Sequence, residues 1–201
     1  WAKAQGLKIA NPERVKQVSS RLLAGQAIKL KSQVPLQGQL PGGIELTNGA
    51  GDILVSFRPS NDAGALHLVP PMLTLGIGCR RGIAVETIES AFCALLGKAC
   101  CHPAAVARVC SIDLKANEPG ILAFCRRRAL PYYTFSAAEL AAVPGEFSGS
   151  AFVQSVAGVD NVCERSAVLG CGAPGGLLAE KSAEGGVTMA LAVGAYALRF
   201  A

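Results

Sequence analysis

The sequence predicts an α/β protein: a small α+β N-terminal unit followed by a layered α/β/α C-terminal domain with a mixed sheet. Short apolar stretches separated by glycine, proline and asparagine fill the first 70 residues. After the two prolines at 70 and 71, strand and helix patterns alternate, and the chain closes on two strand-like segments around a glycine pair. We therefore place a domain boundary near residue 70, with domains at 1–70 and 71–201.

The first domain is expected to hold one helix and several short strands. Asn11 is a suitable N-cap, Pro12 suits the first helical position, and Gly25 suits the end of the helix. Strands are expected at 27–32, 43–47, 52–57 and 66–69. This part of the sequence contains no obvious constellation of catalytic groups.

The second domain is expected to alternate strands and helices. Ser136 and Glu139 form a capping box at the start of one helix. Other helices are expected at 85–97 and 119–128, and after Ser150 and Asn161. Strands are expected at the apolar run that ends near residue 78, at 105–112, at 131–135, and in a closing hairpin of 177–181 and 187–193.

A basic turn framed by glycines, GIGCRRG at 76–82, is the most informative local feature of the second domain. Gly76, Gly78 and Gly82 would allow a tight turn whose N–H groups approach a ligand, and a helix N-terminus would follow. Arg80 and Arg81 add two planar charged donors, so the turn suits a carboxylate or phosphate. The alternative is that one arginine simply faces water. The spacing is not that of a dinucleotide or Walker phosphate loop.

Composition excludes several classes of protein. With 51% hydrophobic and 16% charged residues, the chain is not intrinsically disordered. It has no apolar run of about 18 residues and no signal-peptide pattern, so we expect neither a membrane span nor secretion. The net charge of +5 is explained by solubility or by an anionic ligand. Basic and aromatic residues do not interleave, so nucleic acid is not expected as a partner.

The eight cysteines indicate a reduced, cytoplasmic protein without a metal centre of its own. No C-x-x-C pair occurs, and the two histidines are not at zinc-finger spacing. The Cys100–His102 cluster is better explained as a loop with incidental thiols than as a metal site. Cys79 lies beside two arginines and could be a nucleophile, but buried packing is the default interpretation.

Four further motifs follow the glycine turn in order. They are S-x-D-x-K-x-x-E-x-G at 111–120, SAFV at 150–153, GVDNVCERSA at 158–167 and GVTMA at 186–190. Together the five motifs resemble the CbiG family of cobalamin (vitamin B12) biosynthesis, the cobalt-precorrin-5A hydrolases. The C-terminal domain is also similar to the shorter CobE-type proteins. The resemblance assigns residues 1–70 to the central region of the family and 71–201 to its C-terminal region.

The resemblance implies a hydrolase that opens a δ-lactone on a cobalt-corrinoid intermediate and releases acetaldehyde. Cobalt would arrive within the substrate, so no separate cofactor is expected. Other cobalamin-pathway enzymes and a homodimer stay open as partners. The sequence begins at Trp1 and lacks the domain that family members usually carry upstream, so we expect a fragment or a processed chain. A non-catalytic module that binds or hands over corrinoids is therefore the alternative, and a purely structural interaction domain is a weaker one.

Lactone opening requires a base for water and donors for the developing oxyanion. No serine–histidine–acid grouping is evident, so attack by water aided by a carboxylate is expected. Glu164, Glu118 and Lys115 are the catalytic candidates. The alternatives are a capping box between Asn161 and Glu164, a helix-dipole role for Glu118, and a solvated Lys115 paired with Asp113.

The remaining candidates are expected to bind the substrate. Ser111, Ser150 and Asn161 carry polar side chains within the family motifs and would donate hydrogen bonds to it. The alternative for both serines is that they cap neighbouring helices. With the glycine turn, the predicted substrate-binding set is Gly76, Gly78, Arg80, Arg81, Gly82, Ser111, Ser150 and Asn161.

Overall fold

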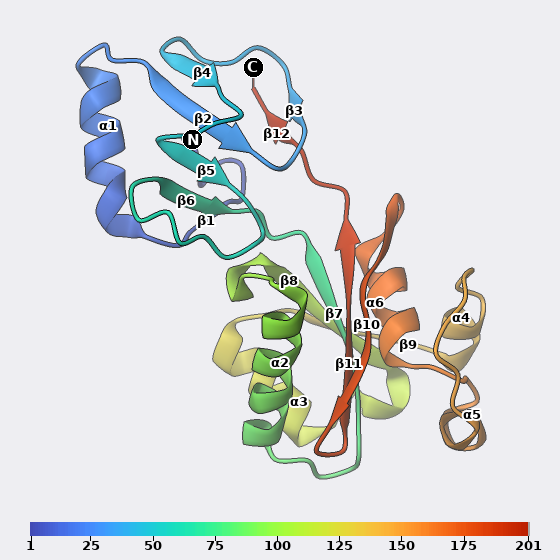
Figure 1. Cartoon of the computed structure of the whole chain (residues 1–201). Helices are drawn as coiled ribbons and strands as arrows, with labels where there is room; N and C mark the ends of the chain where they lie inside the picture. The colour runs from blue at the N-terminus through green and yellow to red at the C-terminus, as the bar shows by residue number, and fades with distance from the viewer. Residues whose placement is uncertain (201) are drawn as a thin grey trace. The chain divides into compact units, whose positions relative to one another are not determined.

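The computed structural model describes residues 1–200, apart from the side chain of Phe152, as two compact units (Figure 1). The first unit comprises Trp1–Pro71, the short segment Cys101–Ala105, and the chain from Tyr196 onward. The second comprises Met72–Cys100 and Val106–Ala195. The sequence had placed the two short segments in the second domain; the assignment of each part to a region of the family stays a prediction.

The first unit is built on a five-stranded sheet in the order β1-β6-β5-β2-β4, shown in blue to teal in Figure 1. The four strands β6, β5, β2 and β4 are parallel, and β1 is antiparallel to β6. The strands are β1 (Lys8–Ile9), β2 (Ile28–Ser32), β4 (Ile44–Leu46), β5 (Ile53–Val55) and β6 (Leu66–Val69). A 3₁₀ turn, η1 (Pro12–Arg14), leads into helix α1 (Val15–Leu23), and β3 (Leu36–Gln37) pairs in parallel with β12 (Leu198–Arg199).

The predicted strands of the first unit are confirmed, whereas the predicted cap of its helix is wrong. The Asn11 side chain makes no capping hydrogen bond. Its Oδ1 instead accepts from the backbone N–H of His67 at 2.8 Å, and its Nδ2 donates to the carbonyl of Ala65 at 2.8 Å. Asn11 therefore fastens the start of the helical segment to β6. The three two-residue strands were not predicted because so short a segment has no readable alternation.

The second unit is a three-layer α/β/α domain, as predicted. Its mixed sheet has the order β10-β11-β7-β8-β9, with β7, β8 and β9 parallel to one another and β11 antiparallel to β7 and to β10. The strands are β7 (Leu73–Cys79), β8 (Val106–Ile112), β9 (Tyr132–Phe135), β10 (Gly175–Glu184) and β11 (Val187–Gly194).

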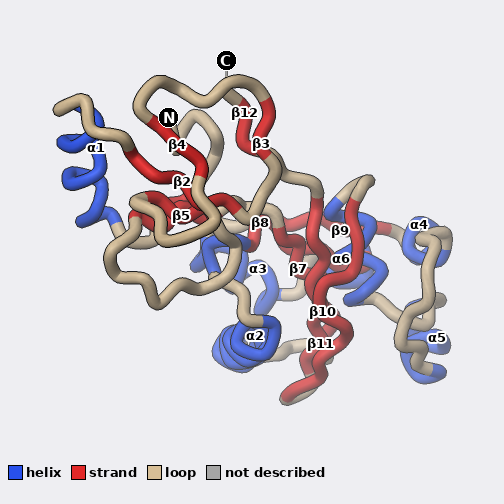
Figure 2. Tube along the Cα trace, turned by 45° about the horizontal axis from the view of Figure 1, so that its top comes forward, coloured by secondary structure: helices blue, strands red, loops and turns tan. Residues whose placement is uncertain are grey.

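Helices cover both faces of this sheet, as Figures 1 and 2 show. On one side lie α2 (Val85–Ala99) and α3 (Pro119–Arg128), and on the other lies α6 (Cys163–Cys171). The short helices α4 (Ala137–Ala141) and α5 (Ala151–Ala157) lie beyond α6. Two 3₁₀ turns, η2 (Pro103–Ala105) and η3 (Asp113–Lys115), flank β8. The predicted capping box of Ser136 and Glu139 is confirmed at the start of α4.

The glycines at 76 and 78 lie within β7 and not in a turn beyond it, which corrects their predicted role. A Cβ on Gly76 would stand 1.8 Å from the carbonyl oxygen of Cys163, and one on Gly78 would stand 2.8 Å from Oγ1 of Thr188. Gly170 on α6 is as tightly placed, since a Cβ there would be 2.3 Å from Sγ of Cys110. Gly76 and Gly170 therefore allow α6 to approach the sheet closely, and Gly78 leaves room for the side chain of Thr188 on β11.

Gly76→Ala tests this packing. Because the added methyl would overlap the backbone of α6, we expect the free energy of unfolding to fall by about 3 kcal/mol. Gly97→Ala is the matched control: Gly97 lies in α2 with no atom within 4 Å of an added Cβ, and alanine there should stabilise the helix by about 0.5–1 kcal/mol. Denaturant unfolding of both variants measures the difference. A Gly76→Ala protein as stable as the wild type would contradict the close approach.

Candidate functional site

The carboxyl ends of β7, β8 and β9 meet at one edge of the sheet of the second unit, because these strands are parallel. The hairpin between β10 and β11 turns at the same edge, since Val187 at the start of β11 pairs with Cys79 at the end of β7. Loops at the carboxyl edge of a parallel sheet are a frequent place for ligands. The loops after β7 and β8 carry Arg80, Arg81 and Lys115, which we call the basic edge.

Arg80 and Arg81 are exposed, and their guanidinium groups have no hydrogen bond or ion pair with any described residue. The backbone of Arg80 is nevertheless fixed, because its N–H donates to the carbonyl of Gly186 at 3.0 Å. Its aliphatic stem passes over Gly186, where a Cβ would lie 3.1 Å from Cδ of Arg80. The hairpin thus directs the stem of Arg80 and leaves its charged end available.

Glu118 occupies the place that the sequence assigned to a ligand anion. Gly82 has a positive φ of 72°, and its N–H donates to Oε1 of Glu118 at 2.8 Å. Lys115 Nζ lies 3.2 Å from Oε2 of the same carboxylate, and Glu118 is only 6% exposed. The glycine turn therefore binds a carboxylate of the chain itself. Lys115 pairs with Glu118 and not with Asp113, and Glu118 holds the two loops together.

Glu164, the first catalytic candidate, is fully buried at the start of α6. Its Oε2 accepts from the N–H of Ser148 at 2.8 Å and from Nδ2 of Asn161 at 2.6 Å, and its Oε1 accepts from the N–H of Lys181 at 2.7 Å. Asn161 in turn accepts from the N–H of Glu164 at 2.8 Å and is itself buried. The two side chains therefore bond to each other at the start of α6, but the predicted capping box is not formed: the N-cap is Val162, and the Glu164 carboxylate accepts from the Asn161 side chain and not from its backbone N–H. Both side chains are buried among partners of the chain itself.

The two serine candidates also bond within the fold. Ser111 is fully buried, and its Oγ donates to the carbonyl of Ile77 at 2.6 Å, joining β8 to β7. Ser150 is the N-cap of α5, and its Oγ accepts from the N–H of Val153 at 3.4 Å. The structure therefore gathers Arg80, Arg81, Gly82, Lys115 and Glu118 at one edge, and gives the other polar candidates structural partners.

Cys79 stands at the end of β7, and its environment does not activate the thiol. Burial raises its pKa to about 11, although the nearby charge of Lys115 acts in the opposite direction. Burial likewise raises the pKa of Cys110 and of Cys125 to about 12. A nucleophilic thiol needs a lowered pKa, so buried packing is the correct interpretation of Cys79.

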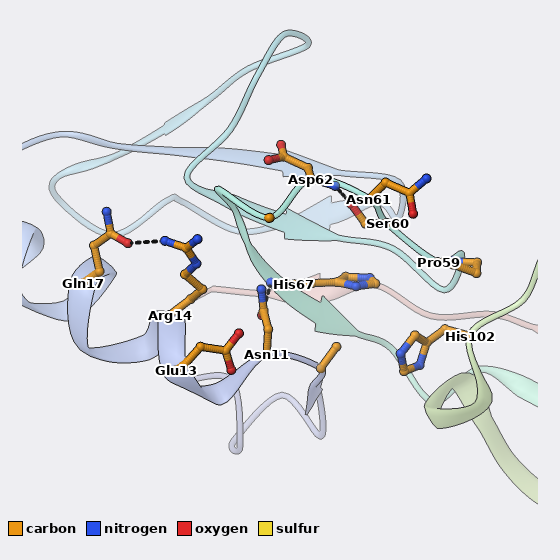
Figure 3. A pocket seen from close by; sticks show the side chains of 12 residues that line it. Asn11, Glu13, Arg14, Gln17, Pro59, Ser60, Asn61, Asp62, His67 and His102 are labelled. Carbon is orange, nitrogen blue, oxygen red and sulfur yellow. Dashed lines mark hydrogen bonds between the residues drawn. The ribbon is translucent and has the colours of Figure 1, made fainter.

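A polar pocket of about 500 Å³, which no sequence pattern predicted, lies in the first unit (Figure 3). His67 of β6 and His102 of the Cys101–Ala105 segment line it together, with ring centroids 5.5 Å apart. Asn11, Arg14 and Asp62 lie on other parts of its wall. A histidine between two leucines in a buried strand could have drawn attention to His67, but no local pattern shows that residues 101–105 return to this unit. We call this cavity the histidine pocket.

Within residues 1–200, no three histidine, cysteine, aspartate or glutamate side chains gather as metal ligands. In the same part of the chain, no helix is long and apolar enough to cross a membrane.

Glu164→Gln tests the structural role of the buried carboxylate. The amide would turn an N–H group toward one of three donors, so we expect the free energy of unfolding to fall by about 2–3 kcal/mol. Glu180→Gln on the exposed side of β10 is the control and should change stability little. Chemical denaturation measures both variants, and an unchanged midpoint for Glu164→Gln would contradict the buried hydrogen-bond set.

Thiol alkylation tests the environment of Cys79. At pH 8 a thiol with a pKa near 11 is about 0.1% thiolate, so Cys79 should react with iodoacetamide far more slowly than exposed Cys93 and Cys100. Its rate should rise about tenfold for each pH unit up to its pKa. Timed peptide mass spectrometry gives the rates, and labelling of Cys79 as fast as that of Cys93 would refute the assignment.

The similarity to known proteins lies mainly in the second unit. Residues 73–192 match the family described as Cobalamin synthesis G C-terminus. Cobalt-precorrin-5A hydrolase of Salmonella typhimurium is 34% identical over 147 residues, which cover 71% of this chain and 41% of the relative. Protein CobE of a Sinorhizobium species is 32% identical over 121 residues, covering 60% of this chain and 79% of that protein. The chain thus spans about two fifths of the length of the hydrolase.

Solved structures of cobalamin biosynthesis proteins are also similar to this chain. The crystal structure of CobE from the cobalamin pathway superposes with a TM-score of 0.56 at 31% identity, covering 62% of this chain and 91% of that one. A cobalamin biosynthesis protein G homologue from Sulfolobus solfataricus shares the fold, with a TM-score of 0.51 at 17% identity over 93% of this chain and 57% of its own. The matched residues, the three-layer fold and these relatives show that the chain belongs to the CbiG family of cobalamin biosynthesis.

Proposed function

We propose that the chain acts in cobalamin biosynthesis as a cobalt-precorrin-5A hydrolase. It binds the cobalt-corrinoid intermediate, opens the δ-lactone with water, and releases the two-carbon fragment as acetaldehyde. The 34% identity to the Salmonella typhimurium hydrolase over 147 residues supports this assignment. Cobalt enters as part of the substrate and not as a cofactor of the protein.

The unpaired guanidinium groups of Arg80 and Arg81 are the observation that carries the proposal. Corrinoid intermediates have acetate and propionate side chains around the macrocycle, so their rim is a ring of carboxylates. A guanidinium binds a carboxylate through two parallel hydrogen bonds, which fixes orientation as well as adding energy. Two adjacent arginines without internal partners therefore suit two neighbouring carboxylates of one substrate.

Lys115 supplies a third positive charge at the basic edge. Its ammonium group is held by Glu118, while its side chain remains 19% exposed. An ammonium has three N–H donors, so the contact with Glu118 leaves donors for a further anion. Glu118 joins Lys115 to the backbone of Gly82, which follows the arginines in the chain, and neutralises part of the lysine's charge. Lys115 is thus proposed as a secondary carboxylate contact.

A non-catalytic corrinoid-binding or hand-over module is the second candidate function. The chain covers 79% of Protein CobE but only 41% of the hydrolase, and the buried Glu118 and Glu164 both have structural partners. In that case binding at the basic edge would be retained, and another cobalamin-pathway enzyme would perform the chemistry. Self-association as a homodimer remains a separate proposal for solution measurement. For either function we propose a reducing cytoplasmic location, supported by the eight free cysteines.

The decisive experiment incubates the chain with cobalt-precorrin-5A and follows acetaldehyde and the opened lactone by mass spectrometry, with binding measured in parallel. Arg80→Ala/Arg81→Ala should weaken binding about 100-fold, because charged hydrogen bonds contribute about 1.5–3 kcal/mol each. Lys98→Ala/Arg126→Ala is the control, since it removes two exposed positive charges elsewhere on the same unit and should leave binding unchanged.

The outcomes separate the candidate functions. Acetaldehyde release by the wild-type chain supports the hydrolase, and binding without release supports the hand-over module. Equal affinity of the arginine double variant and its control would remove the basic edge as the binding site. A folded wild-type chain that neither binds nor converts the intermediate would overturn the proposed function itself.

A further inference from the structure

The histidine pocket holds two imidazoles whose orientations are fixed by the backbone. His67 is 4% exposed, and its Nε2 lies 3.0 Å from the carbonyl oxygen of Ser56. His102 Nδ1 lies 3.1 Å from the backbone N–H of Ala104. The rings meet edge to face at an interplanar angle of 80°, and both line the pocket (Figure 3).

These two contacts determine where each ring carries its proton. A carbonyl oxygen can only accept, so His67 must donate from Nε2–H, and its Nδ1 is then a bare acceptor. A backbone N–H can only donate, so His102 must accept at Nδ1 and carry its proton on Nε2. Neither His67 Nδ1 nor His102 Nε2 has a hydrogen-bond partner among the described residues. The pocket thus offers one basic nitrogen and one N–H donor.

We infer that His67 and His102 form the hydrolytic site of this chain, with His67 as the base that activates water and His102 as the donor to the oxyanion. This inference rests on the proposed function, because it names the residues that would open the lactone. It replaces the carboxylates that the sequence suggested for the task. The pocket belongs to the first unit, and of its two histidines only His102 falls within the family match at 73–192.

The step balances without any further reagent. Water attacks the acyl carbon of the lactone while His67 Nδ1 takes one of its protons, and the carbonyl oxygen becomes an oxyanion that accepts a hydrogen bond from His102 Nε2–H. The acyl C–O bond then breaks, and the departing alkoxide takes the proton from His67. The products are an alcohol and a carboxylic acid, which loses its proton to solvent. The later release of the two-carbon fragment is not assigned to these residues.

The environment of His102 favours its neutral ring. Burial and the neighbouring His67 lower the pKa of His102, so its imidazole stays uncharged near neutral pH and acts as a donor without titrating. The other charged groups on the pocket wall are Glu13, Arg14 and Asp62. Arg14 donates to Gln17, and Asp62 accepts from the N–H of Gly64.

Two other roles for the pair are less consistent with its contacts. A metal site would need a third ligand, and residues 1–200 provide no such group. A purely structural role would explain the bonds to Ser56 and Ala104, and it would leave the two other ring nitrogens to solvent in the pocket. A hydrolytic role gives a function to all four ring nitrogens: two hold the rings to the backbone, and two act on water and on the oxyanion.

Variants of each ring test the assignment in the full chain. His67→Gln keeps an N–H donor for Ser56 but has no basic nitrogen, so kcat for lactone opening should fall about 10²–10⁴-fold. His102→Phe keeps a ring but has no donor, so kcat should fall about 10²–10³-fold, and His102→Gln, which restores an N–H, should recover part of the loss. KM should change little in all three. Glu45→Gln, on exposed β4 of the same unit, is the control for activity.

The outcomes distinguish this inference from the function on which it rests. If the wild type converts the intermediate and both His67→Gln and His102→Phe retain kcat within about threefold, the inference is overturned while the hydrolase stands. If the wild type binds without conversion, the hydrolytic site falls together with the hydrolase. A loss of rate in a histidine variant supports the inference only if that variant unfolds at a denaturant midpoint near that of the wild type.

Nitrogen-15 NMR of the histidines provides a test that needs no substrate. At pH 7.5 His102 should be neutral with its proton on Nε2, and it should titrate below its usual range. The neutral form of His67 should also carry its proton on Nε2. His67→Gln should move the titration of His102 upward, because a neighbouring imidazole that disfavours its charge has been removed. A protonated His102 at this pH, or a proton on Nδ1 in the neutral form of either histidine, would refute the site.

Discussion

A carboxylate can be removed from water only if donors replace the water, and Glu164 has such donors from three segments of the chain. The N–H groups of Ser148 and Lys181 and the amide of Asn161 all point at it. This set joins the loop before α5, the start of α6 and strand β10. With α6 held there, its backbone can lie against the bare Gly76 of β7, and the layered arrangement of the second unit follows.

The same interaction accounts for the polar residues of a distinctive motif. Asn161, Glu164 and Ser166 all lie in GVDNVCERSA, and each is buried and bonded within the fold: the Ser166 hydroxyl contacts the carbonyls of Cys110 and Cys163. A run of polar residues around a helix start is what a buried cap requires, and it is also what a site would contain. Sequence alone cannot separate the two, because the difference lies in whether the polar atoms face protein or solvent.

The fold was predictable wherever a local pattern determines the structure. The capping box at Ser136 depends on residues three apart, and the alternation of strands and helices in the second unit follows from apolar periodicity. Gly76 was misinterpreted because a glycine that permits a turn and one that admits a neighbouring helix look identical until the helix is placed. The pairing of β12 with β3 and the placement of His102 in the first unit depend on contacts between distant segments, which no local pattern encodes.

The proposed roles of the two units follow from the charge states of their side chains. Guanidinium groups attract the carboxylates of a corrinoid rim, but a permanently protonated group cannot accept a proton from water. Neutral imidazoles have the opposite properties: they contribute little attraction to an anionic substrate, and one bare nitrogen can accept a proton near neutral pH. Binding at Arg80 and Arg81 and chemistry at His67 and His102 are therefore separable functions. A chain that kept binding but lacked the chemistry would still recognise the intermediate, as the hand-over alternative requires.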